Sequence, residues 1–130
     1  MSEEMTANPA PGFAKHPDHK IRLMPAGRRM RVVLGCTTVA ESDTVLVMRE
    51  GDYPPVYYFP RADVNMGLLS ASDHASFCPF KGDASWWTVE AGERREENVA
   101  WSYEAPFDEM QAIAGMVAFY DNRVKLEVTG

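Results

Sequence analysis

The chain has 130 residues, of which 45% are hydrophobic and 25% charged, and its net charge is −6. This composition suits one globular domain, and the sequence shows neither the roughly 18 consecutive apolar residues of a membrane-spanning helix nor a signal peptide. Because the negative charge also disfavours nucleic acid, we expect a soluble cytoplasmic protein that binds neither nucleic acid nor membrane.

Residues 1–19 are predicted to form an extended N-terminal arm. Pro9, Pro11 and Pro17 interrupt this segment, and charged residues are scattered through it, which disfavours a regular helix or strand. Such an arm either wraps around the domain or stays mobile. The remaining residues, 20–130, are predicted to form a single β-rich domain.

From residue 21 onward, short apolar runs alternate with turn residues at close spacing. Glycine, proline, aspartate and asparagine separate the runs, as they do in turns between strands. This pattern indicates a mostly β fold, an antiparallel sandwich or open barrel rather than βαβ units. The predicted strands are residues 21–24, 30–34, 37–40, 44–49, 56–59, 86–89, 99–103, 116–120 and 124–128.

The sequence has one basic cluster, which surrounds the first two predicted strands. The simplest interpretation of this cluster is a solvated strand face rather than a binding site. The cluster consists of Arg22, Arg28, Arg29 and Arg31.

One main helix is predicted over residues 106–114. Pro106 suits the first helical position, Asp108 complements the helix dipole, and Gly115 can end the helix. Apolar residues recur within it at helical spacing, which gives one stripe to pack on a sheet. A shorter helical turn is expected within residues 61–69.

Residues 72–83 differ from the rest of the chain, and we call them the polar segment. They are too polar for a central strand, and Pro79 and Gly82 favour a loop. Loops held by a scaffold often carry functional groups. The candidate catalytic residues in this segment supply an imidazole, a thiol and an ammonium group, and they are His74, Cys78 and Lys81.

Each of these three residues has a chemical and a structural interpretation. Cys78 is a nucleophile if nearby positive charge stabilises its thiolate, whereas a free cysteine is often a small buried hydrophobe. His74 is a general base, a metal ligand or a hydrogen-bonded loop histidine. Lys81 binds a phosphate or carboxylate, or is simply solvated. Because the chain lacks paired cysteines, no structural zinc is expected, and we predict no cofactor.

Aromatic residues in two predicted strands can form the wall of a pocket. Adjacent Trp86 and Trp87 point to opposite faces of a strand, so we expect one in the core and the other in a cleft or interface. Aromatic walls with a few polar groups are typical of small-molecule sites, and a thick aromatic core is the structural alternative. We expect Asn98 and Trp101 to face the polar segment across a cleft, with Trp86 and Tyr103 as further ligand-binding candidates.

Over residues 20–126 the chain resembles the domain of unknown function 427 family. The resemblance rests on linked motifs at residues 56–64, 72–74, 78–87, 97–103 and 115–120. It implies a β-tent-like fold of two antiparallel sheets, shared with methionine sulfoxide reductases whose paired zinc cysteines are lacking here. Arg61, in the first motif, is another ligand-binding candidate. The family has no settled activity, so the resemblance implies an architecture and a cleft but no reaction.

The sequence therefore favours a domain that binds an unidentified small molecule, with or without catalysis, between the polar segment and the aromatic strands. The alternative is a non-catalytic interaction module that uses the same aromatic residues as a partner surface, which leaves room for a homo-oligomer. An enclosed cleft with converging polar groups supports the first interpretation, and a flat apolar patch supports the second.

Overall fold

The structure is a computed structural model that describes residues 7–129. Ten strands within these residues form two antiparallel sheets, so the expected mostly β fold is confirmed. The seven-stranded sheet has the order β1-β4-β5-β9-β8-β7-β6, and the three-stranded sheet has the order β10-β2-β3. The strands are β1 (Ile21–Pro25), β2 (Met30–Leu34), β3 (Thr37–Ser42), β4 (Leu46–Glu50), β5 (Val56–Phe59), β6 (Leu69–Cys78), β7 (Gly82–Ala91), β8 (Arg94–Ser102), β9 (Val117–Phe119) and β10 (Lys125–Val128).

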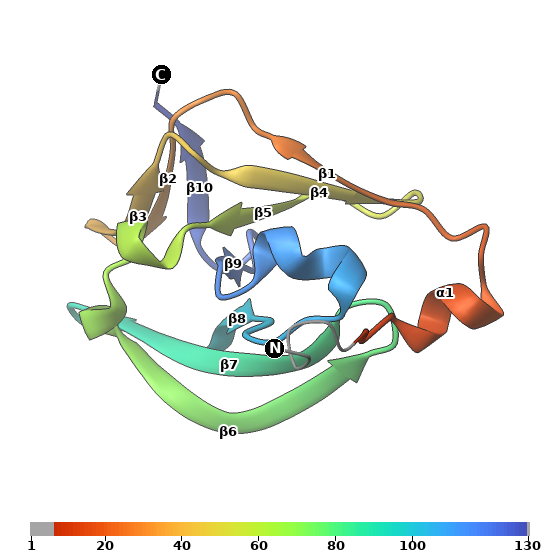
Figure 1. Cartoon of the computed structure of the whole chain (residues 1–130). Coiled ribbons are helices and arrows are strands. Elements are labelled where there is room, and N and C mark those ends of the chain that lie inside the picture. Colours follow the sequence, from red (N-terminus) through yellow and green to blue (C-terminus); the bar gives the residue numbers. More distant parts are fainter. Residues whose placement is uncertain (1–6, 130) are drawn as a thin grey trace, which may run out of the picture.

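The seven-stranded sheet is curved and has a cluster of buried residues on each face. Figure 1 shows it bending from β1 and β4 at the top to β6 and β7 at the bottom, with the three-stranded sheet at the left. One face packs against the small sheet and forms the inter-sheet core, which includes Val32 and Phe59. The other face carries what we call the second cluster, which includes Met48, Tyr58 and Ile113.

The polar segment, residues 72–83, is a β-hairpin rather than a loop, so that prediction is wrong. The strand β6 continues to Cys78, and β7 begins at Gly82. Because β6 is an edge strand of its sheet and most of its residues are exposed, it needs no apolar alternation. A register shift between Ala71 and Ala75 adds an irregularity of the kind that protects sheet edges from pairing with other chains.

The helix predicted over residues 106–114 is present, but as a 3-10 helix rather than the α-helix that its spacing indicates. This element, η4 (Asp108–Ile113), is interrupted at Met110, where φ is −115° and ψ is 19°. Met110 and Ile113 are its buried residues, and residues three apart align on one side of a 3-10 helix. Packing of Met110 and Ile113 into the second cluster therefore outweighs the preference of this segment for an α-helix.

Residues 7–19 are not an extended arm throughout, which corrects the prediction for this part of the chain. They include α1 (Pro11–Lys15), a short α-helix with proline in its first turn, where proline is well tolerated. The segment packs on the domain, because the amide of Gly12 donates to the carbonyl of Pro79 at 2.9 Å. Two further backbone amides donate to carboxylates of η4 at 2.7 and 2.9 Å. Residues 1–6 of the predicted arm lie outside the described residues.

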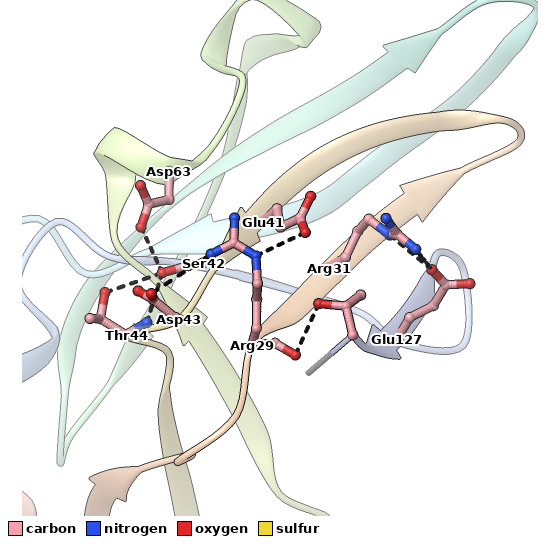
Figure 2. Close-up of polar contacts among 9 residues, drawn as sticks. Arg29, Arg31, Glu41, Ser42, Asp43, Thr44, Asp63 and Glu127 are labelled. Atoms are coloured by element: carbon pink, nitrogen blue, oxygen red, sulfur yellow. Dashed lines mark hydrogen bonds and ion pairs between the residues drawn. The ribbon is translucent and has the colours of Figure 1, made fainter.

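The helical turn predicted within residues 61–69 consists of two 3-10 helices, η2 (Arg61–Asp63) and η3 (Met66–Leu68). The buried hydroxyl of Ser42 donates to Asp63 at 2.6 Å and so ties β3 to η2 (Figure 2). None of the helices in residues 7–129 is long and apolar enough to cross a membrane.

Two arginines of the basic cluster are paired with acidic residues. Figure 2 shows Arg29 beside Glu41 and Arg31 beside Glu127, with nitrogen–oxygen distances of 3.0 and 2.9 Å. The Arg31 pair joins β2 to β10, and the Arg29 pair joins the residue just before β2 to β3. They agree with the interpretation of the cluster as a solvated strand face.

Candidate functional site

A groove opens between the turn that joins β4 to β5 and the segment that joins β9 to β10. Its volume is about 470 Å³, and ligand pockets typically have about 300–1,000 Å³. We call it the aromatic groove, because rings from three strands and two connecting segments dominate its lining. These rings belong to Tyr53, Tyr57, Phe59, Trp101, Phe119 and Tyr120.

The β4–β5 turn is shaped by residues with unusual backbone preferences. Gly51 has a φ of +51°, a conformation that glycine adopts more readily than any residue with a side chain. The amide of Tyr53 donates to the carbonyl of Glu50 at 2.9 Å, and Pro54 and Pro55 restrict the chain that follows. The turn therefore holds the Tyr53 ring, which is 71% exposed, at the solvent side of the groove.

A cluster of stacked rings connects the groove with the edge of the sheet. Trp101 and Tyr120 line the groove with ring centroids 4.8 Å apart, and both contact Trp86, at 5.4 and 5.8 Å. The Trp86 indole N–H donates to the Ser76 hydroxyl at 3.0 Å. The ring of His74 meets Trp86 edge-to-face at 5.0 Å. One continuous set of rings thus runs from β6 to the groove.

Glu50 lines the groove and is the centre of a partly buried ion-pair network. Lys81 Nζ donates to one carboxylate oxygen at 2.7 Å, and His19 Nε2 donates to the other at 2.8 Å. Burial acts to raise the pKa of Glu50, but the hydrogen bonds and charges of Lys81 and His19 outweigh it and hold that pKa below its ordinary value. Glu50 therefore stays ionised, and both of its oxygens already accept a hydrogen bond.

Two phenols are buried in the second cluster, near Glu50. Burial raises the pKa of Tyr58 and Tyr103 well above the ordinary value, and the negative charge of Glu50 raises both further. Trp101 also packs against the second cluster and so ties the wall of the groove to it. Both phenols therefore stay protonated at neutral pH.

Comparison with known proteins gives the family. The family model described as domain of unknown function 427 matches residues 22–130. The chain belongs to this family. No curated protein matches the chain. The matched region of this DUF427 chain carries the whole lining of the aromatic groove, whereas α1 and His19 precede it.

In this DUF427 domain the three candidate catalytic residues have three different environments. His74 is exposed and packs on Trp86, whereas Cys78 is half-buried against the second cluster. Lys81 is neither a solvated loop residue nor open to a phosphate, because it is largely buried and bound to Glu50. Within residues 7–129 no side-chain hydrogen bond or ion pair joins the three. A shared catalytic role therefore stays a prediction.

The tryptophan residues of the DUF427 domain are placed partly as expected. Trp101 lines the groove, and Trp86 reaches it through ring stacking. Trp86 and Trp87 point to opposite faces of β7, but both are buried, at 9% and 8% exposure. The expectation that one of them lies in a cleft or interface is therefore wrong. Both faces of β7 are covered, one by the inter-sheet core and the other by the second cluster.

The remaining ligand-binding candidates lie outside the groove lining. Tyr103 is buried in the second cluster. The Arg61 guanidinium lies 5.1 Å from the centre of the Trp87 ring and 3.1 Å from a Glu104 carboxylate oxygen. Asn98 has a φ of +52° at a register shift between β7 and β8, a conformation that asparagine tolerates better than most residues. These positions point to structural roles.

Sequence reasoning missed most of the groove. Glu50 resembled an ordinary charged residue at a strand end, because its partners Lys81 and His19 are each 31 positions away. The run Tyr53-Pro54-Pro55 was the available signal, since two prolines in a turn hold a neighbouring ring in place. Among the described residues, no group of three or more His, Cys, Asp or Glu is placed to hold a metal ion, and the expected lack of zinc stays a prediction.

Proposed function

We propose that this domain binds a small organic molecule in the aromatic groove. The groove itself carries the proposal: a hollow of about 470 Å³ with six aromatic side chains and few polar groups in its lining. Flat apolar walls with a small number of fixed polar groups are the usual make-up of small-molecule sites. Glu50 supplies such a fixed group, since Lys81 and His19 hold its carboxylate in place.

The distribution of exposed apolar residues supports this proposal over an interaction module. The exposed large hydrophobic residues in the described part of the chain include Met24, Phe77 and Val128, which lie on three strands that do not pair with one another. Tyr53 and Tyr120 are also exposed, and both belong to the groove. A protein-binding face would instead gather such residues in one contiguous patch.

The proposal concerns binding in the cytoplasm. Cys36 and Cys78 are not joined in a disulfide, which fits a reducing compartment. Catalysis by the polar segment is not included, because His74 and Cys78 do not contribute to the groove lining.

Titration with indole, a flat uncharged probe, tests the proposal. We expect amide NMR signals of residues 50–53, 56–57 and 119–126 to shift, and Tyr53→Ala to weaken the affinity roughly fivefold by removing one ring contact. Phe77→Ala is the matched control, because Phe77 is an exposed aromatic residue outside the groove, and it should leave the affinity unchanged. Shifts spread evenly over the surface, or no effect of Tyr53→Ala, would contradict the proposal.

A further inference from the structure

The charged side chains of the aromatic groove indicate which class of molecule it takes. We infer that the occupant is an organic cation, with a quaternary ammonium, ring-nitrogen cation or guanidinium group on a flat apolar body. This inference rests on the proposed binding function and adds the charge of the ligand to it.

Among residues 7–129, carboxylates are the only charged side chains that line the groove. The lining contains Glu50 and Asp121 but no lysine, arginine or histidine. The charge of Glu50 is already balanced, because Lys81 and His19 bind its two oxygens. Glu50 can therefore orient a ligand but offers little net charge, and the uncompensated charge of the groove comes from Asp121.

Asp121 is exposed and forms no ion pair or side-chain hydrogen bond with any residue from 7 to 129. The basic residues that follow it in the chain are engaged elsewhere. Arg123 donates to Glu96 at 3.0 Å, and Lys125 lies 3.1 Å from Glu127. A cationic ligand would give Asp121 the partner that residues 7–129 do not provide.

The aromatic walls favour the same class of ligand. The face of a tryptophan or tyrosine ring is electron-rich and attracts a cation, more strongly when the cation is withdrawn from water. Four rings of this kind line the groove, and Trp101 and Tyr120 are tilted at 49° to each other. A cation seated there can contact ring faces while its charge remains near the Asp121 carboxylate. The four rings belong to Tyr53, Tyr57, Trp101 and Tyr120.

We expect the groove to bind an anionic ligand weakly. A phosphate or carboxylate group would meet Asp121 without a cationic donor in the lining, on a protein whose net charge is −6. An uncharged flat molecule would keep the apolar contacts but leave Asp121 paired only with water. The groove therefore discriminates by charge as well as by shape.

Three two-ring probes of similar size test the inference: N-methylquinolinium as the cation, quinoline as the neutral molecule at mildly alkaline pH, and 1-naphthoate as the anion. Affinities are measured by amide NMR titration of the full chain. We expect the cation to bind at least roughly fivefold more tightly than quinoline, from its contact with ring faces and a carboxylate, and the anion to bind most weakly.

The variant Asp121→Asn should reduce the affinity for the cation to within about twofold of that for quinoline and leave quinoline binding unchanged. Asp52→Asn is the matched control, because Asp52 is exposed in the β4–β5 turn but does not line the groove. Equal binding of cation and quinoline would overturn the inference while the proposed binding function stands. If no probe binds, both are overturned. If Asp52→Asn acts as strongly as Asp121→Asn, the assignment to Asp121 is wrong.

Discussion

Glu50 accepts hydrogen bonds from Lys81 and His19, which lie 31 positions after it and 31 positions before it in the chain. The side chains of Glu50, Lys81 and His19 are only 18%, 13% and 26% exposed. Burying a charged group costs free energy unless the group is paired and hydrogen-bonded. The contacts of Glu50 with Lys81 and His19 offset this cost. This network ties the end of β4 to the β6–β7 turn and to the N-terminal segment.

Replacing Lys81 by an apolar residue should therefore destabilise the fold. We expect Lys81→Met to lower the free energy of unfolding by about 1–3 kcal/mol, because Glu50 loses a donor in a partly buried position. The control is Arg95→Met, which breaks ion pairs of a side chain that is 52% exposed and should change stability much less. Urea unfolding of both variants measures the difference, and equal effects would mean that the Glu50 network is as weak as a surface pair.

The same network gives the stability of the protein a pH dependence. The folded-state pKa of Glu50 is held below its ordinary value, so the network contributes fully above the unfolded-state pKa, about 4.3, and its contribution is lost as pH falls through the folded-state pKa. We expect the stability advantage of the wild type over Glu50→Gln to shrink as the pH is lowered through this range. Urea unfolding at several pH values measures it, and a difference that is constant with pH would contradict the assignment.

Two elements support the groove from outside its lining. β7 carries Trp86, which packs against Trp101 of the groove, and the N-terminal segment carries His19, which binds Glu50. Both faces of β7 are covered, so Trp86 and Trp87 can both be buried although they point to opposite faces of the strand. The N-terminal segment packs across the β6–β7 turn, where the rings of His19 and Phe80 stack with centroids 4.1 Å apart. Gly12 makes this packing possible, because a Cβ atom there would lie 2.7 Å from the Phe80 ring.

A side chain at position 12 should therefore loosen the N-terminal segment. We expect Gly12→Val to speed amide hydrogen exchange in residues 12–19 by pushing α1 away from Phe80, while exchange in the strands changes little. The control Ala14→Val places the same β-branched side chain at an exposed position of α1. If both variants exchange at the same rate, the cause is the helix preference of valine and not the contact with Phe80.

At the scale of the whole molecule, one curved sheet carries both clusters of buried residues. β7 and β8 contribute to the inter-sheet core on one face and to the second cluster on the other, so neither cluster can come apart without disturbing the sheet. Domains of this size usually unfold as one cooperative unit. Because the two clusters share these strands, we keep the prediction that residues 20–130 form a single domain.

We expect urea unfolding followed by tryptophan fluorescence to coincide with unfolding followed by far-UV circular dichroism. Trp87 reports on the inter-sheet core and Trp86 on the second cluster, whereas circular dichroism reports on the backbone of both sheets. The midpoints should not depend on protein concentration. Separate midpoints for the two signals would show that the two faces unfold independently, and the single-domain prediction would be wrong.

Local patterns in the sequence were sufficient for much of the fold. Apolar runs between turn residues predicted nine of the ten strands, because strand and turn preferences act over a few neighbouring positions. The predicted ends of 30–34 and 56–59 match β2 and β5, and the other seven strands have at least one end shifted. The period of a strand also placed Trp86 and Trp87 on opposite faces. The strand that was missed, β6, lies at a sheet edge, where pairing with β7 rather than an apolar pattern holds it in place.

The sequence by itself determined the fold class, the family and most strand positions. Only the tertiary structure decided that Glu50 meets Lys81 and His19, that Trp86 and Trp87 are both buried, and that the β4–β5 turn faces Tyr120 across a groove. These contacts join residues far apart in the chain, and they depend on strand order, register and the curvature of the sheet. Local composition carries little information about strand order, register or curvature, because these properties are set by pairing between segments that are distant in the sequence.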